Sequence, residues 1–230
     1  MTRAPAFLPL WQDGGLFARL RAACAPAWQA YVAHDFVRQL GAGTLPKPAF
    51  QHYLKQDYLF LIHYARAWAL ATAKASSLAE MRSANASVKA ILDVEMGLHV
   101  AFCRDWGIDE KTLEATQEAE ATLGYTRYVL ARGLDGDLLD LVVALSPCAL
   151  GYAEIGRNLA AHATPANPYA AWIAMYAGAE FADVARGVAD EVDRLGQTRG
   201  GHARFDDLAK TFAQACRLEA DFWRQGLATA

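Results

Sequence analysis

Residues 48–74 have the sequence PAFQHYLKQDYLFLIHYARAWALATAK, and this stretch decides the fold class. Six of its residues follow one another at alternating spacings of four and three: Phe50, Leu54, Asp57, Leu61, Tyr64 and Trp68. These spacings match the 3.6-residue repeat of an α-helix and place the side chains on one face. Pro48 suits a first helical turn, where the missing N–H removes no hydrogen bond. The stretch therefore predicts a long helix from about Pro48 to Lys74.

The rest of the chain has the same helical character. Its 8 prolines fall in a few places, and the segments between them are rich in Ala, Leu, Glu and Arg, with few of the Val, Ile and Thr runs that strands prefer. We expect a flexible loop at Gly196–His202. Further helices are expected at about Leu16–Leu40 with a disturbance at Pro26, Leu78–Trp106, Glu110–Arg132 with a weak point at Gly124, Gly136–His162, Pro168–Leu195 and Phe205–Leu227. The sequence thus predicts one all-α domain over residues 1–230.

Composition excludes several classes of protein. Hydrophobic residues make up 54% of the 230 residues and charged ones 20%, which is too apolar for a disordered chain. A net charge of −3 argues against a nucleic-acid binder, which needs a cationic surface. The uncharged run Leu141–Ala153 is shorter than the ~20 residues that span a bilayer. We therefore expect no membrane segment.

The N-terminus and the cysteines bear on the cellular location of the protein and on its need for disulfides or zinc. Pro5, Pro9 and Asp13 interrupt the short apolar run after Arg3, so no export signal is expected and the predicted location is the cytoplasm. The 4 cysteines are widely spaced and form no C-x-x-C pair. Neither a disulfide framework nor a zinc site is indicated.

Polar residues interrupt the apolar faces of several predicted helices. Asp57 lies in the middle of its stripe, and Glu219 lies in the stripe of the last helix. Glu95 interrupts a stripe made of Met81, Val88, Ile91, Leu98 and Phe102. A buried carboxylate costs several kcal/mol unless it is bonded, paired or neutralised. These residues predict either separate structural groups or one shared polar pocket that also receives Cys148 and Tyr152.

A metal or haem centre is a weaker alternative. A di-iron bundle needs Glu-x-x-His on two helices, and the sequence contains none. Glu95 and His99 lie one turn apart and could bind a metal, although such a pair is common on ordinary helices. We predict no metal site and interpret Glu95 as a structural partner of another buried polar group.

Cys148 follows Pro147 within a predicted helix. The proline removes one N–H and crowds the carbonyl of Val143, which would open backbone polar groups beside the thiol. Cys148 is then either a nucleophile or a small buried hydrophobe in a bent helix. The residues alone leave both interpretations open.

At this point the sequence resembles a known family. Residues 145–156, LSPCALGYAEIG, resemble the Pro-Cys…Tyr-x-Glu-x-Gly motif of the TenA (thiaminase II, aminopyrimidine aminohydrolase) family. The resemblance covers nearly the whole chain in order: GTLP at 43–46, YLKQDYL at 53–59, EMGLH at 95–99, Tyr125-Thr126, WIAMY at 172–176 and EADFW at 219–223. It implies an all-α, haem-oxygenase-like helical bundle without haem or other cofactor, commonly a homotetramer.

The resemblance also implies an activity and residue roles. The expected reaction releases the hydroxymethyl pyrimidine from 4-amino-5-aminomethyl-2-methylpyrimidine and, more slowly, from thiamin. Cys148 matches the family nucleophile and Glu219 the acid/base carboxylate. Asp57 matches the group that holds the aminopyrimidine edge. The implied pocket tyrosines are Tyr125, Tyr152 and Tyr176.

One position departs from the family pattern. The residue three after Asp57 is usually tyrosine, and here it is Phe60, which keeps the aromatic face and loses a hydroxyl. This departure leaves open a non-catalytic or regulatory protein that binds a pyrimidine. A separate alternative is a haem-oxygenase-like oxidase that acts on another small molecule, with oxygen or a metal near Glu95 and His99.

Overall fold

A computed structural model describes residues 9–228, so the expectation about the extreme N-terminus lies outside the described residues. Within them every regular element is helical, which confirms the all-α prediction. The α-helices are α1 Leu16–Ala23, α2 Ala25–Val32, α3 Asp35–Ala42, α4 Lys47–Lys74, α5 Leu78–Ala90, α6 Met96–Asp105, α7 Glu110–Glu114, α8 Glu120–Asp135, α9 Leu138–Ala160, α10 Ala170–Ala177, α11 Ala179–Thr198 and α12 Phe205–Leu227. A π-helical turn, Ile91–Glu95, joins α5 to α6.

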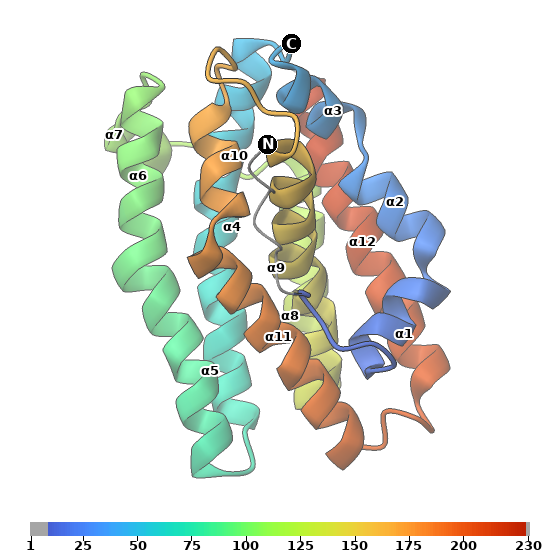
Figure 1. The fold of residues 1–230 in the computed structure, drawn as a ribbon. Coiled ribbons are helices and arrows are strands. Elements are labelled where there is room, and N and C mark those ends of the chain that lie inside the picture. Colours follow the sequence, from blue (N-terminus) through green and yellow to red (C-terminus); the bar gives the residue numbers. More distant parts are fainter. Residues whose placement is uncertain (1–8, 229–230) are drawn as a thin grey trace.

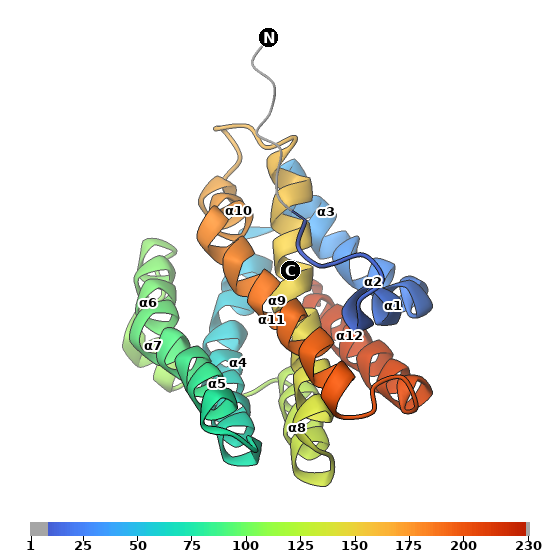
Figure 2. The same ribbon diagram turned by 60° about the horizontal axis from the view of Figure 1, so that its bottom comes forward.

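The helices are arranged around α9. In both ribbon views α5 and α6 lie on one side of α4, and α1, α2 and α12 lie on the opposite side of α9 (Figures 1 and 2). Helix α9 packs against α8, α10, α11 and α12. It is long and apolar enough to cross a membrane, but 89% of its apolar window is buried inside the protein. It is therefore a core helix surrounded by other helices.

Helix α9 contains Pro147 and continues through it. The helix starts with a capping box in which the Asp137 and Asp140 side chains each accept from the other's backbone N–H. We expected Pro147 to leave the Val143 carbonyl open beside the thiol. Instead, the hydroxyl of Ser146 donates to that carbonyl at 3.0 Å. The backbone group that the proline frees is thus satisfied within the helix, and it is not available to the site.

The helix expected at Leu16–Leu40 is three helices. It breaks at Cys24, because Pro26 lies in the first turn of α2, and again at His34, whose ring accepts a hydrogen bond from the Phe36 N–H at 3.2 Å. The helix expected at Pro168–Leu195 breaks at Gly178, and α11 then runs on to Thr198, into the loop predicted from Gly196.

The helix expected at Glu110–Arg132 also breaks, but not at Gly124. Helix α7 ends at Glu114 and α8 starts at Glu120, and Gly124 lies inside α8. The break is held by Gln56 of α4, whose amide donates to the Gln117 carbonyl and accepts from the Ala119 N–H, both at 3.0 Å. A long-range side-chain contact therefore decides this boundary.

The π turn changes which residues of α6 face inward. A π turn carries one extra residue, so the positions after it are displaced around the helix axis relative to a continuous α-helix. Leu98, predicted to face inward, is 59% exposed, whereas His99 and Cys103 are buried. Met81, predicted inward on α5, is 43% exposed. The inward stripe predicted for this segment was wrong at both of these positions. The π turn accounts for Leu98, whereas Met81 lies before the turn.

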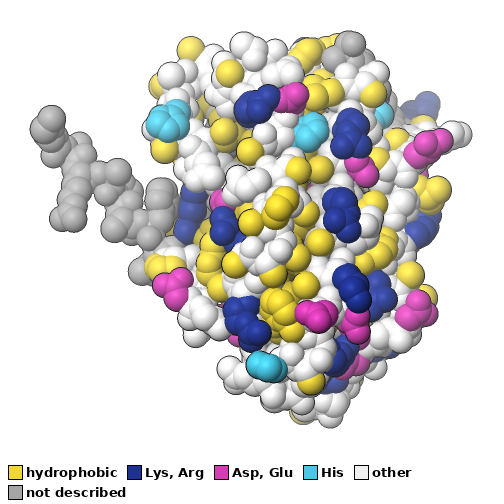
Figure 3. All heavy atoms as spheres, turned by 90° about the vertical axis from the view of Figure 1, so that its right-hand side faces the viewer, with side chains coloured by type: hydrophobic (Ala, Val, Ile, Leu, Met, Phe, Trp, Pro, Cys, Tyr) yellow, Lys and Arg dark blue, Asp and Glu magenta, His cyan; other side chains and the backbone are white. Residues whose placement is uncertain are grey.

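Charged side chains of both signs cover the side of the molecule where α2 and α12 lie. The space-filling view of that face shows Lys and Arg interspersed with Asp and Glu and with small hydrophobic groups (Figure 3). Several of the charges are paired along α12, as in Lys210–Asp207 at 2.9 Å. Such a mixed surface presents no single-sign field on this face.

Candidate active site

Asp57 lies in α4 at the centre of the bundle and is 4% exposed. Tyr53, one turn earlier, donates to its Oδ2 at 3.3 Å, and the Trp172 indole N–H donates to the Tyr53 hydroxyl at 3.2 Å. Burial raises the pKa of Asp57 to about 7, and the Tyr53 hydrogen bond offsets part of that rise. At neutral pH this carboxyl is therefore available as both an acid and an acceptor.

His99 supports Asp57 from α6. Its Nε2 lies 2.9 Å from the Leu54 carbonyl, a pure acceptor, so Nε2 carries the proton. Its Nδ1 lies 3.5 Å from Asp57 Oδ2. Burial lowers the pKa of His99, which favours the neutral ring with an acceptor at Nδ1. His99 and Tyr53 thus both contact Oδ2 of Asp57 and fix the orientation of its carboxyl.

Glu219 lies in α12 and is 2% exposed. The Tyr125 hydroxyl of α8 donates to its Oε1 at 2.8 Å. Burial raises the pKa of Glu219 to about 8; the Tyr125 hydrogen bond lowers it and the charge of Asp57 raises it. A carboxyl with this pKa is mostly protonated at neutral pH and can both give and take a proton.

Cys148 lies in α9 and is less buried than most of that helix. Burial raises the pKa of its thiol well above the ordinary value, and the nearby carboxyls of Glu219, Glu95 and Asp57 raise it further. A hydrogen bond from the Tyr64 hydroxyl acts in the opposite direction. In the resting site the sulfur is therefore a thiol, and a nucleophilic thiolate requires that a neighbouring group take its proton.

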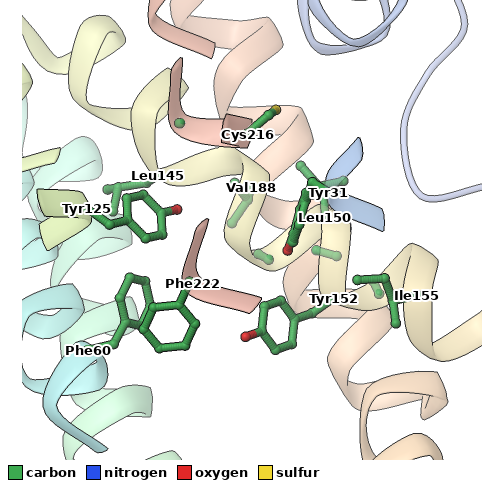
Figure 4. Packing of buried hydrophobic residues seen from close by; sticks show 14 of the residues in the cluster. Tyr31, Phe60, Tyr125, Leu145, Leu150, Tyr152, Ile155, Val188, Cys216 and Phe222 are labelled. Atoms are coloured by element: carbon green, nitrogen blue, oxygen red, sulfur yellow. The ribbon is translucent and has the colours of Figure 1, made fainter. Parts of the chain in front are cut away.

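Aromatic rings line the space between these groups. Phe60 stacks against Tyr125 at 5.1 Å and against Tyr64 at 5.5 Å. Tyr152 contacts Tyr176 at 4.8 Å between ring centroids. Figure 4 shows Tyr125 and Tyr152 with their hydroxyls directed toward the region bordered by Phe60 and Phe222. Flat apolar faces with polar edges are the surroundings that a heteroaromatic ring needs.

A glycine sets the position of Tyr176. A Cβ added at Gly156 of α9 would lie 2.4 Å from the backbone carbon of Tyr176. No side chain fits there, so α10 can approach α9 only at a glycine. This close approach holds the Tyr176 ring against Tyr152.

The predicted site residues form one cluster within the bundle. Direct contacts link Phe60 to Tyr125, Tyr125 to Glu219, and Tyr152 to Tyr176. Trp172 touches the Tyr152 ring and joins the Tyr152–Tyr176 pair to Tyr53 and Asp57. Phe222 contacts both Tyr53 and Phe60 and so joins the two groups. Sequence reasoning did not assign four members of the cluster to the pocket: Tyr53, Tyr64, Trp172 and His99, which was considered only as a metal ligand. The spacing of four residues between Tyr53 and Asp57 was the signal for the first of them.

Glu95 differs from our expectation. It ends the π turn and is half-buried, and burial together with the charge of Asp57 raises its pKa to about 7. No hydrogen bond from Glu95 to another side chain is found within residues 9–228, so it is not the bonded structural partner we expected. The same residues contain no group of three His, Cys, Asp or Glu side chains arranged to hold a metal ion.

Comparison with known proteins places the chain among TenA relatives. A profile of the TENA/THI-4/PQQC family matches residues 21–229. The chain is 39% identical over 201 residues to an aminopyrimidine aminohydrolase of Halalkalibacterium halodurans, covering 86% of this chain and 89% of that protein. It is 28% identical over 204 residues to the aminopyrimidine aminohydrolase of Bacillus subtilis, covering 88% and 86%.

Solved structures show the same fold. A crystal structure described as a TenA family transcription regulator, from Silicibacter sp. TM1040, is 45% identical with a TM-score of 0.89, covering 93% of this chain and 97% of that one. A domain with a heme oxygenase-like fold from Shewanella denitrificans is 13% identical with a TM-score of 0.72, covering 92% of each chain. The haem-oxygenase-like bundle expected from the sequence is thereby confirmed.

Proposed function

This chain belongs to the TENA/THI-4/PQQC family, and we propose that it is an aminopyrimidine aminohydrolase. The substrate is 4-amino-5-aminomethyl-2-methylpyrimidine, and the products are the hydroxymethyl pyrimidine and ammonia. One observation carries the proposal. A buried carboxyl with a pKa of about 8, Glu219, lies close enough to Cys148 to raise the pKa of its thiol. A nucleophile and a neutral proton donor therefore lie near each other inside the bundle.

The substrate ring binds between the aromatic walls. Phe60 and Tyr125 offer stacked faces, and an electron-poor pyrimidine stacks favourably on such rings. Asp57 then meets the aminopyrimidine edge, where its carboxyl accepts from the exocyclic amine and shares a proton with the ring nitrogen. Tyr53 and His99 both contact Oδ2 of that carboxyl, so its direction is set before the substrate arrives.

The first half of the reaction breaks the C–N bond. Cys148 gives its proton to the Asp57 carboxylate, and the thiolate adds to a ring carbon while Asp57 passes this proton to the ring nitrogen. The ring electrons then form an exocyclic double bond at the methylene and expel the amine. Glu219 donates the proton that lets the amine leave as ammonia, a transfer that its raised pKa favours.

The second half restores the ring. A water molecule adds to the exocyclic methylene and gives its proton to the Glu219 carboxylate formed in the first half. The C–S bond then breaks and the thiolate leaves, while the ring nitrogen returns its proton to Asp57 and the ring becomes aromatic again. Asp57 passes this proton back to the sulfur, so Cys148 ends the cycle as a thiol. Glu219 ends the cycle protonated, as it began, so the sum is replacement of the amine by a hydroxyl.

A second candidate is a protein that binds the pyrimidine without turnover. Phe60 favours it, because the hydroxyl usual at this position is missing and Phe60 is packed tightly between Tyr64 and Tyr125. This candidate uses Asp57 and the aromatic walls and gives no role to the raised pKa of Glu219.

The proposal for the enzyme also includes slower cleavage of thiamin itself, a cytoplasmic location and assembly into a homotetramer.

The experiment is direct turnover. The purified protein is incubated with the aminomethyl pyrimidine or with thiamin, and release of ammonia or thiazole is followed. We expect release from the first substrate, loss of it in Cys148→Ser, and a fall in kcat of about 10²–10⁴-fold with little change in KM in Glu219→Gln. Cys103→Ser, at a buried cysteine outside the site, is the matched control. Tight binding by calorimetry with no product would favour the second candidate.

A further inference from the structure

Tyr31 of α2 has an unusual environment. The residue is fully buried, and its hydroxyl has no hydrogen-bond partner among residues 9–228. Its ring is held edge-on by Trp28 at 6.0 Å and stacked on Trp223 at 6.4 Å. A buried hydroxyl without a partner destabilises the folded protein, and phenylalanine would fill the same space without that cost. Packing therefore does not explain why this residue carries a hydroxyl.

The Tyr31 hydroxyl points into the candidate active site. Figure 4 shows it directed toward the same region as the hydroxyls of Tyr125 and Tyr152. The charges that act on it most strongly are those of Glu219 and then Cys148, which raise its pKa beyond the effect of burial. Both catalytic groups of the proposed reaction are thus neighbours of this hydroxyl.

A glycine makes room for Tyr31 beside the nucleophile. A Cβ added at Gly151, three residues after Cys148, would lie 2.1 Å from Tyr31 Cε1 and 2.6 Å from its hydroxyl oxygen. The phenol therefore lies directly against the backbone of α9, about one turn from Cys148. Only glycine at this position lets the phenol come so close to the backbone of α9.

We propose that the Tyr31 hydroxyl binds the attacking water and, together with Glu219, positions it at the exocyclic methylene. This inference rests on the proposed function. The water oxygen forms the new C–O bond, one water proton passes to the Glu219 carboxylate, and the Tyr31 hydroxyl holds the oxygen through a hydrogen bond without changing its own protonation. The bound water supplies the partner that Tyr31 lacks within the protein.

The test is Tyr31→Phe in the full-length enzyme. We expect kcat for the aminomethyl pyrimidine to fall at least 10-fold while KM changes less than about 3-fold. A second readout is the product ratio with hydroxylamine added as a competing nucleophile. The variant should give a larger share of the hydroxylamine product, because the attacking water loses its hydrogen bond to the Tyr31 hydroxyl. A purely structural role would not change this ratio.

Tyr169→Phe is the matched control. Tyr169 is also a buried tyrosine, but its hydroxyl donates to the Leu45 carbonyl. That variant should melt at a lower temperature with an unchanged product ratio, whereas Tyr31→Phe should melt no lower than the wild type. A lower Tm for Tyr31→Phe, or wild-type kcat and product ratio, would overturn the inference. If Cys148→Ser remained active, the proposed function itself would fail.

Discussion

Tyr125 donates a hydrogen bond of 2.8 Å to Glu219, joining α8 to α12 between residues 94 positions apart. Such a bond stabilises the carboxylate and lowers its pKa, yet burial has the larger effect, and the pKa of Glu219 stays raised to about 8. Tyr125 therefore tunes a proton donor whose pKa is close to neutrality. The balance between these two effects leads to a prediction.

Tyr125→Phe should move the pKa of Glu219 upward. The variant keeps the ring that stacks on Phe60 and loses only the donor to the carboxylate, so the charged form of Glu219 becomes less favourable. The limb of the activity profile that reports ionisation of Glu219 should shift to higher pH, by about 1 unit. The pH dependence of kcat/KM checks this. A shift to lower pH would show that Tyr125 does not act as the donor.

Glu219 should also make the wild type less stable as pH rises. Its carboxyl has a pKa of about 8 in the folded protein against 4.5 in the unfolded chain, so the folded state binds the proton more tightly. The stabilising effect is complete below about pH 4.5 and is lost as the pH rises toward 8. In Glu219→Gln this loss is absent, because the amide does not titrate.

Urea unfolding at several pH values measures this difference. We expect the free energy of unfolding of the wild type to fall relative to Glu219→Gln by a few kcal/mol between pH 5 and 8, since one pKa unit corresponds to about 1.4 kcal/mol. Above pH 8 the difference should stay constant. If the free energy of unfolding of the wild type rose relative to that of Glu219→Gln between pH 5 and 8, Glu219 would not be a buried neutral carboxyl.

Much of the fold followed from local sequence patterns. The stripe of α4 was predicted correctly because one uninterrupted helix carries it, and Phe50, Leu54 and Leu61 are all buried. The stripe beyond Ile91 was not, because a π turn displaces the later residues and hydrophobic periodicity does not reveal it. The end of α7 likewise depends on Gln56, which is far away in the sequence.

The candidate site was predicted only in part for the same reason. Asp57 and Glu219 interrupt apolar stripes, so periodicity alone identified them. Tyr31 and His99 could not be found in this way. The direction of Tyr31 depends on the break between α1 and α2, and that of His99 on the π turn. Helical periodicity assumes a continuous helix, so it does not identify side chains whose direction depends on a break or a π turn.

Gly151→Ala should destabilise the protein and impair the site. The new methyl group would come within 2.1 Å of the Tyr31 ring, which must move away from α9. We expect a loss of about 1–3 kcal/mol in the free energy of unfolding and a lower kcat. Gly124→Ala in α8 is the matched control, since nothing lies within 4 Å of its added Cβ. Alanine there should stabilise the helix by up to about 1 kcal/mol with unchanged activity.

The proposed homotetramer leads to the last prediction. Leu92, Val94 and Leu98 are each more than half exposed and belong to one short segment, the π turn and the start of α6. Helix α6 lies at the outer edge of the bundle (Figures 1 and 2). Exposed apolar side chains grouped in this way are typical of an interface between subunits. The wild type should have the mass of four 25.0 kDa chains by light scattering. Leu98→Glu should dissociate it, because an uncompensated charge would enter the interface. Leu134→Glu, at an exposed leucine near the end of α8, should leave the mass unchanged. A wild type with the mass of a single chain would contradict the assembly and leave the active-site proposals intact.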